Sequence, residues 1–127
     1  MKKLSILVAF MTIGLVMASD PVKELNTYTV EKTEITNVSP FCISIAKGDY
    51  EMVKKMVELG TEVNESSEGM TPLMYAARYN RIEIIKLLVA NGAKINKKNG
   101  KGFNALKYAD MSGAKDAKAL LLELKKK

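Results

Sequence analysis

The stretch that decides the fold is residues 71–96, which read TPLMYAARYNRIEIIKLLVANGAKIN. The same pattern occurs before it, over residues 39–64, and returns in weaker form after it, over residues 104–122. Self-similarity at a period of about 33 residues is typical of proteins built from stacked repeats. The sequence therefore predicts one structural unit stacked about three times within residues 39–127.

Each unit carries the signals of two short helices joined by a turn. Thr71 and Ser39 can cap a helix with their hydroxyl groups, and the prolines that follow them suit a first helical position, where no N–H is needed. Apolar residues at helical spacing over residues 82–89 predict a second, amphipathic helix. Residues suited to turns or to a left-handed backbone are expected between and after the helices: Gly48, Asn80, Gly60 and Gly92.

Residues 39–125 resemble the ankyrin-repeat family, whose repeat opens Thr-Pro-Leu-His-x-Ala-Ala and closes on a leucine-rich helix, Gly-Ala and Val-Asn. Met74 stands where the family usually has histidine, and Asn80-Arg81 replaces the usual Gly-His. The resemblance implies an all-α solenoid of about three helix–turn–helix repeats with protruding loops. The repeat boundaries that it implies are 39–68, 69–101 and 102–127.

The third repeat is expected to close the stack. It has Ala105 in place of proline, and Lys107, Lys115 and Lys118 fall among its helical positions. Its last helix ends in lysines 125–127, where cations favour a helix C-terminus. A helix with one face on the stack and the other in water is what a terminal cap requires.

The first 19 residues read as an export signal rather than as part of the fold. Two lysines precede an apolar run over residues 4–17, and cleavage is expected after Ala18 or Ser19. The run is too short for a comfortable membrane span, so no stable membrane insertion is expected after signal removal, although an uncleaved anchor stays an alternative. The signal looks bacterial and predicts a periplasmic location, with full secretion as the alternative.

Residues 20–38 are predicted to form an extended N-terminal arm, because threonines and alternating apolar residues favour extended backbone. Three interpretations stay open. The arm is a loose tail, it covers the exposed flank of the first repeat, or it pairs with the edge of a partner's sheet.

Charge is divided unevenly along the chain. Residues 20–68 carry five lysines and ten acidic residues, whereas residues 69–127 carry 13 basic and four acidic residues. One interpretation is an ordinary solvated surface. A second is an acidic protein partner, bound by the basic residues Arg78, Arg81, Lys94, Lys97, Lys98 and Lys101. Head-to-tail self-association is a third, and nucleic acid is disfavoured because no aromatic residues alternate with the basic ones.

Composition argues against catalysis. The chain has no histidine and one cysteine, Cys42, which excludes the common general base, histidine-based nucleophile pairs and histidine-containing zinc sites. No cofactor or metal is expected. Cys42 is interpreted as a small, partly buried helix residue, with a reactive or intermolecular thiol as the alternative. A hydrolase that uses the loop carboxylates Glu65 and Glu68 stays an alternative function.

The resemblance implies that a protein partner binds the concave surface formed by the loop tips and the first helix of each repeat. Tyr75, Arg78, Tyr79 and Tyr108 are the preferred anchors, because tyrosine and arginine are enriched in interface cores; alternatively, the tyrosines fill gaps between helices. The predicted binding residues are Met70, Met74, Tyr75, Arg78, Tyr79, Lys97, Lys98, Lys101, Phe103 and Tyr108. The wider surface adds Glu65, Ser67, Glu68, Lys107 and Met111. The predicted function is a non-enzymatic interaction module, with a secreted effector that binds host proteins as the alternative.

Overall fold

The computed structural model describes residues 37–127. The predicted signal peptide, its cleavage site and residues 20–36 of the predicted arm lie outside the described residues. Within residues 37–127 the chain forms six α-helices, and their order is α2 (Pro40–Lys47), α3 (Tyr50–Glu58), α4 (Pro72–Arg78), α5 (Ile82–Ala90), α6 (Ala105–Met111) and α7 (Lys115–Lys126).

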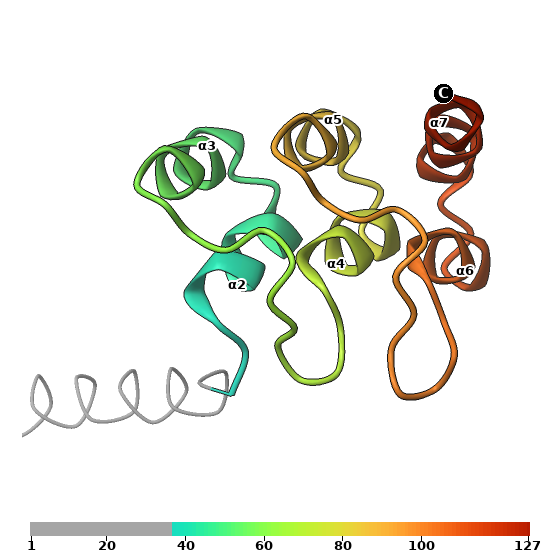
Figure 1. Cartoon of the computed structure of the whole chain (residues 1–127), viewed down its shortest axis with the longest axis horizontal. Helices are drawn as coiled ribbons and strands as arrows, with labels where there is room; N and C mark the ends of the chain where they lie inside the picture. Colours follow the sequence, from blue (N-terminus) through green and yellow to red (C-terminus); the bar gives the residue numbers. More distant parts are fainter. Residues whose placement is uncertain (1–36) are drawn as a thin grey trace, which may run out of the picture. The chain divides into compact units, whose positions relative to one another are not determined.

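The helices form three antiparallel pairs, as the sequence predicts. Figure 1 shows α2, α4 and α6 side by side in one row and α3, α5 and α7 in a second row above it. Two long loops project beyond the first row, one between α3 and α4 and one between α5 and α6. We call residues 64–70 finger 1 and residues 97–103 finger 2. The first row is the inner row because it adjoins the fingers, and the prediction of an all-α stack of about three repeats is confirmed.

The predicted helix starts are found at the expected residues. The Ser39 hydroxyl accepts a hydrogen bond from the backbone N–H of Cys42 at 3.2 Å, and that of Thr71 accepts from Met74 at 3.2 Å. The Met74 sulfur in turn accepts from the Thr71 N–H at 3.3 Å. Met74 therefore completes a reciprocal capping arrangement, although methionine replaces the histidine that is usual in the family.

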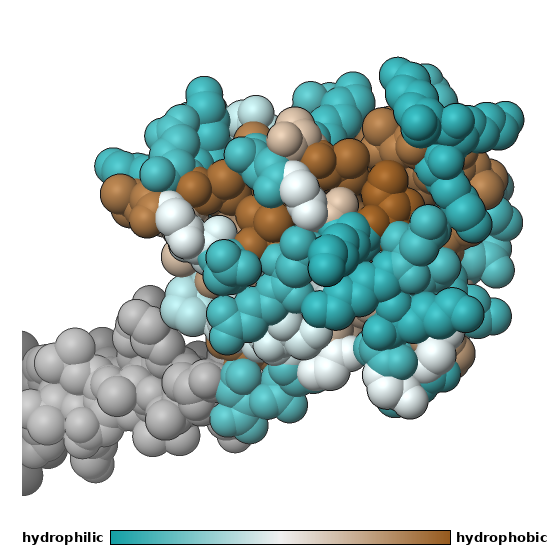
Figure 2. Space-filling model, viewed as in Figure 1, coloured by the Kyte–Doolittle hydropathy of each residue, from teal (hydrophilic) through white to brown (hydrophobic). Residues whose placement is uncertain are grey.

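The core runs along the interior between the two rows. Ala76, Ala77 and Ala109 are fully buried, and their small side chains let α4 and α6 pack closely. Ile85 and Leu88 of the outer row are fully buried against them. Figure 2 shows hydrophobic surface as a band between the two rows on this face, while the fingers are mainly hydrophilic.

The surface at the C-terminal end of the stack carries charged side chains where the earlier repeats have buried apolar ones. Four side chains of the first two repeats are fully buried at positions that face the following repeat: Ile45, Val53, Ala77 and Ile85. The corresponding residues of the third repeat are Asp110 and Lys118, which are exposed and form an ion pair at 2.7 Å. The prediction of a polar terminal cap is therefore met by a specific ion pair.

At the opposite end of residues 37–127, an apolar side chain is exposed at a stacking position. Met52 is 45% exposed, whereas the matching Ile84 and Ala117 in the next two repeats are 3% and 0% exposed. The position of Met52 is buried wherever a described repeat precedes it, so in the first repeat it belongs to a stacking surface that no other part of residues 37–127 covers.

None of the helices within residues 37–127 combines the length and the apolar character needed to cross a bilayer.

Candidate functional site

The fingers are held in shape by their own backbone. In finger 1, Ser67 and Met70 exchange two backbone hydrogen bonds of 2.8 and 3.2 Å across a turn that contains Gly69. In finger 2, the Asn99 N–H donates to the Phe103 carbonyl at 2.9 Å. Gly69 and Gly102 occupy the same place in successive repeats and have φ angles of +78° and +80°. Both turns need a left-handed residue at this position, which glycine provides without strain.

One tyrosine joins each finger to its inner helix, and the two tyrosines occupy equivalent positions in successive repeats. The Tyr75 hydroxyl of α4 donates a hydrogen bond of 2.8 Å to the Ser67 carbonyl of finger 1. The Tyr108 hydroxyl of α6 accepts a bond of 2.7 Å from the Asn99 side chain of finger 2. Burial raises the pKa of Tyr75 above its ordinary value, so the phenol stays protonated and keeps its donor.

Two asparagines form hydrogen bonds between segments about 30 residues apart in the sequence. Asn64, at the base of finger 1, donates to the Gly92 carbonyl at 3.0 Å and accepts from the Lys94 N–H at 2.9 Å. Asn99 donates to the Gly69 carbonyl, at the tip of finger 1, at 2.9 Å. Asn99 therefore links the two fingers directly, and Asn64 links finger 1 to the residues just before finger 2.

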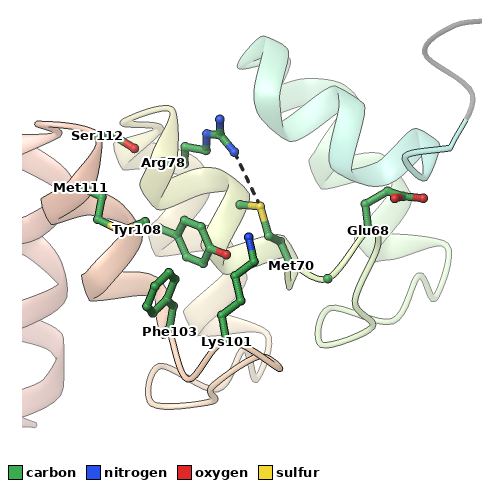
Figure 3. A pocket seen from close by; sticks show the side chains of 9 residues that line it. Glu68, Met70, Arg78, Lys101, Phe103, Tyr108, Met111 and Ser112 are labelled. Carbon is green, nitrogen blue, oxygen red and sulfur yellow. Dashed lines mark hydrogen bonds between the residues drawn. The ribbon is translucent and has the colours of Figure 1, made fainter.

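An open groove of about 440 Å³ lies between the second and third repeats. Finger 1 and the end of α4 form one wall, and finger 2 and α6 form the other (Figure 3). The residues that line it are Glu68, Gly69, Met70, Arg78, Lys101, Phe103, Tyr108, Met111 and Ser112.

The groove combines an apolar floor with cations. The Phe103 and Tyr108 rings meet edge to face, with centroids 5.8 Å apart, and the ammonium group of Lys107 lies 5.9 Å from the Phe103 ring centre. Arg78 donates to the Met70 sulfur at 3.9 Å, a weak acceptor (Figure 3). Neither Arg78 nor Lys101 has a carboxylate oxygen within 4.0 Å among residues 37–127.

The structure divides the predicted binding residues into groups. Those that line the groove are Met70, Arg78, Lys101, Phe103 and Tyr108. Tyr79 is 43% exposed, with the Arg78 guanidinium 5.7 Å from its ring centre, and Lys98 is exposed on finger 2. Both therefore lie near the groove without lining it.

Three of the predicted residues make hydrogen bonds within the fold. Met74 is 0% exposed, which corrects its placement on the binding surface, because its sulfur is turned inward to cap α4. Tyr75 is 7% exposed and holds finger 1. The Lys97 ammonium donates to the Asn64 carbonyl at 3.1 Å, across the repeat boundary.

Arg81, proposed from its charge as part of a basic surface, also serves the fold. Its Nε donates to the Ala46 carbonyl of the preceding repeat at 3.1 Å, and its Nη2 donates to the same oxygen. The guanidinium therefore binds a backbone carbonyl in the last turn of α2.

Sequence reasoning missed Ser112 and Gly69 as lining residues. Ser112 holds the place in the third repeat that Tyr79 holds in the second, so the repeat register could have placed it beside the predicted surface. Met111, from the wider predicted surface, is 51% exposed in the groove.

The residues considered as a reactive thiol or as hydrolytic carboxylates differ in exposure. Cys42 is fully buried, and burial raises the pKa of its thiol, which makes it a poor nucleophile. Glu65 and Glu68 are both exposed on finger 1. Among residues 37–127, no cluster of three or more acidic or cysteine residues is arranged to hold a metal ion.

Comparisons with known proteins agree with this geometry. A family model described as "Ankyrin repeats (3 copies)" matches residues 16–99 and 41–127. The human "Ankyrin repeat and SOCS box protein 11" is 33% identical over 85 residues, which cover 67% of this chain and 26% of that protein. A "Putative ankyrin repeat protein" of Rickettsia bellii is 32% identical over 99 residues, which cover 72% of this chain and 58% of the relative.

A third relative is "Alpha-latrocrustotoxin-Lt1a" of Latrodectus tredecimguttatus, 38% identical over 87 residues, which are 67% of this chain and 6% of the toxin. The chain spans less than two thirds of the length of each of these relatives. Ankyrin-repeat proteins are typically non-enzymatic modules that bind other proteins. From its three helix pairs, its paired fingers and the matching family model, the chain belongs to the ankyrin-repeat family.

Proposed function

We propose that this chain is a non-enzymatic module that binds a protein partner on the surface formed by the fingers and the inner helices α4 and α6. The observation that carries the proposal is the groove between repeats two and three. It exposes Arg78, Lys101 and Met111, and its cations have no carboxylate partner among residues 37–127. Exposed arginine, methionine and tyrosine side chains are enriched in the cores of protein interfaces.

The proposed location is the bacterial periplasm. The support is the pattern of residues 1–19, with lysines 2 and 3 before a short apolar run. A secreted effector that binds host proteins is the second candidate. Fractionation of the producing cells separates the two: recovery in the periplasm supports the first, and recovery in the culture medium supports the second.

The partner can be sought by crosslinking in the native cells, with a photoreactive amino acid in place of Tyr79. This side chain is suited to the purpose because it is exposed beside Arg78 and donates no hydrogen bond that holds a finger. A matched control carries the same amino acid in place of Lys86, which is exposed on the outer helix α5.

The proposal expects a crosslinked protein at position 79 that is absent at position 86. The crosslink should disappear when Arg78→Ala is added. Equal labelling at both positions, or no labelled protein at position 79, would remove the proposed binding surface.

The hydrolase alternative has a separate test. If purified protein shows a hydrolytic activity, Glu65→Gln/Glu68→Gln should abolish it. Retention of that activity in the double variant would exclude the loop carboxylates as its source.

A further inference from the structure

We propose that the groove between the second and third repeats recognises an extended acidic segment of the partner protein, with one side-chain carboxylate bound between Arg78 and Lys101 and an adjacent apolar side chain on Phe103 and Met111. The inference rests on the proposed function and specifies the chemistry of the bound segment.

The first argument is that neither cation is paired with a carboxylate or a backbone carbonyl among residues 37–127. Three other basic residues of the second and third repeats are bound to the protein itself. Arg81 donates to the Ala46 carbonyl, Lys97 to the Asn64 carbonyl, and Lys118 to Asp110. Within residues 37–127, the one side-chain hydrogen bond of Arg78 goes to the Met70 sulfur at 3.9 Å, beside the contact of its guanidinium with the Tyr79 ring, and the Lys101 ammonium makes no hydrogen bond. A guanidinium with free N–H groups binds a carboxylate through two parallel hydrogen bonds.

The second argument is that the Arg78 and Lys101 side chains extend toward the same point of the groove. Arg78 comes from the end of α4 and Lys101 from finger 2, yet Figure 3 shows both side chains extending toward Met70. The hydrogen bond from Asn99 to the Gly69 carbonyl links finger 2 to finger 1, next to Met70. A carboxylate placed over Met70 would therefore meet two positive charges that are already in position, which reduces the ordering cost of binding.

The third argument is the apolar surface next to the cations. Phe103 is half-buried against Tyr108, and Met111 is 51% exposed. Figure 3 places Phe103 and Met111 on the same side of the groove as Tyr108. An aliphatic or aromatic side chain of the partner would bury these surfaces, which supplies affinity that a lone ion pair in water lacks.

Glu68 sets the orientation of the segment. It lines the same groove but lies at the end away from Met111 and Ser112 (Figure 3). A second carboxylate at that end would be repelled. The bound segment therefore places its apolar residue toward α6 and a neutral or basic residue toward Glu68.

The test begins with two libraries of random peptides displayed on phage, screened against the purified full chain. In one library the peptides are internal, so every carboxylate comes from a side chain. In the other the peptides end in a free C-terminus. The proposal expects the internal library to yield sequences with an acidic residue adjacent to Leu, Ile, Phe or Met.

Binding of a selected peptide, synthesised with both ends blocked, is then measured by fluorescence anisotropy. We expect Arg78→Gln/Lys101→Gln to weaken binding about tenfold or more, because two charged contacts at the centre of the site are lost. Lys54→Gln/Lys55→Gln is the matched control: it removes the same charge from exposed positions on α3 and should leave the affinity unchanged. Met111→Gln should weaken binding by a smaller factor, and thermal unfolding curves verify that each variant is folded.

The proposal is overturned if the enriched peptides lack an acidic residue, if no sequence is enriched, or if enrichment occurs only with a free C-terminus. It is also overturned if Arg78→Gln/Lys101→Gln binds the peptide as tightly as the parent chain does. A partner that crosslinks at position 79 while these assays fail would refute the acidic segment but leave the proposed function standing. Absence of that crosslink would refute the proposed function itself.

Discussion

The side-chain oxygen of Asn80 accepts a hydrogen bond of 2.9 Å from the backbone N–H of Ala117, in the following repeat. Ala117 lies in the first turn of α7, and the residue that precedes this helix, Ala114, makes no side-chain cap. Asn80 also turns the chain between α4 and α5 with a φ of +57°. One residue of the second repeat therefore makes a tight turn and caps a helix of the third.

Two substitutions separate these roles of Asn80. Asn80→Gly keeps the left-handed turn but loses the cap on α7, at a cost of about 1 kcal/mol. Asn80→Ala loses the cap and also forces a Cβ into left-handed backbone, which adds about 1 kcal/mol. Urea unfolding should therefore rank the parent above Asn80→Gly and Asn80→Ala last. Equal stabilities for the two variants would show that the turn imposes no cost on alanine.

Gly48 and Arg81 are predicted to be energetically coupled. A Cβ added at Gly48 would lie 3.0 Å from the Arg81 Cζ, and the residue has a φ of +79°. Gly48→Ala should cost about 1 kcal/mol from the backbone alone, and more while Arg81 is present. A double-mutant cycle with Arg81→Ala, measured by chemical denaturation, should give a non-additive result. Strict additivity would mean that the guanidinium moves aside without cost.

The Asp110 carboxyl should titrate below the ordinary aspartate range. The hydrogen bond from Lys118, followed by its positive charge, lowers the pKa of Asp110. A carboxyl with a lowered folded-state pKa stabilises the fold above its unfolded pKa, and this contribution is lost as the pH falls through the folded value. Carbon-detected NMR titration should show the low pKa in the parent and a higher one in Lys118→Met. An unchanged pKa in that variant would assign the shift to another group.

Tyr75 is predicted to stabilise the fold rather than to anchor a partner. Tyr75→Phe removes the hydroxyl that donates to the Ser67 carbonyl and should cost about 1 kcal/mol in the free energy of unfolding. Because the side chain is only 7% exposed, affinity for a peptide selected against the groove should change little. Calorimetry and fluorescence anisotropy on the same sample measure the two effects. A large loss of affinity without loss of stability would reverse the assignment.

The repeat pattern was sufficient to predict the fold and most helix starts from the sequence. Thr71 and Ser39 cap helices as expected, and Gly60 and Gly92 have the left-handed backbone that was predicted after α3 and α5. These features depend on neighbours within a few residues or on an exact repeat, which a sequence displays directly.

The site was predicted less completely, because the fates of similar side chains depend on contacts between one repeat and the next. Arg78 and Arg81 lie close together in the chain, yet only Arg81 reaches a backbone carbonyl of the preceding repeat. Lys97 and Lys101 differ in the same way across finger 2. Met74 is predicted on the binding surface because the resemblance assigns that surface to the first helix of each repeat, and its sulfur bond to Thr71 is visible only in three dimensions.

The two ends of the stack differ in how readily an additional repeat could pack against them. Within residues 37–127, Met52 leaves an apolar stacking position open at one end, whereas a helix pair added at the other end would have to remove water from the Asp110–Lys118 ion pair. An engineer who wishes to lengthen this scaffold should therefore add units beside α3, or first replace the ionic couple with alanine and isoleucine. Head-to-tail association through the two ends of residues 37–127 would have to bury the Asp110–Lys118 ion pair, so the C-terminal surface opposes the growth of a fibre.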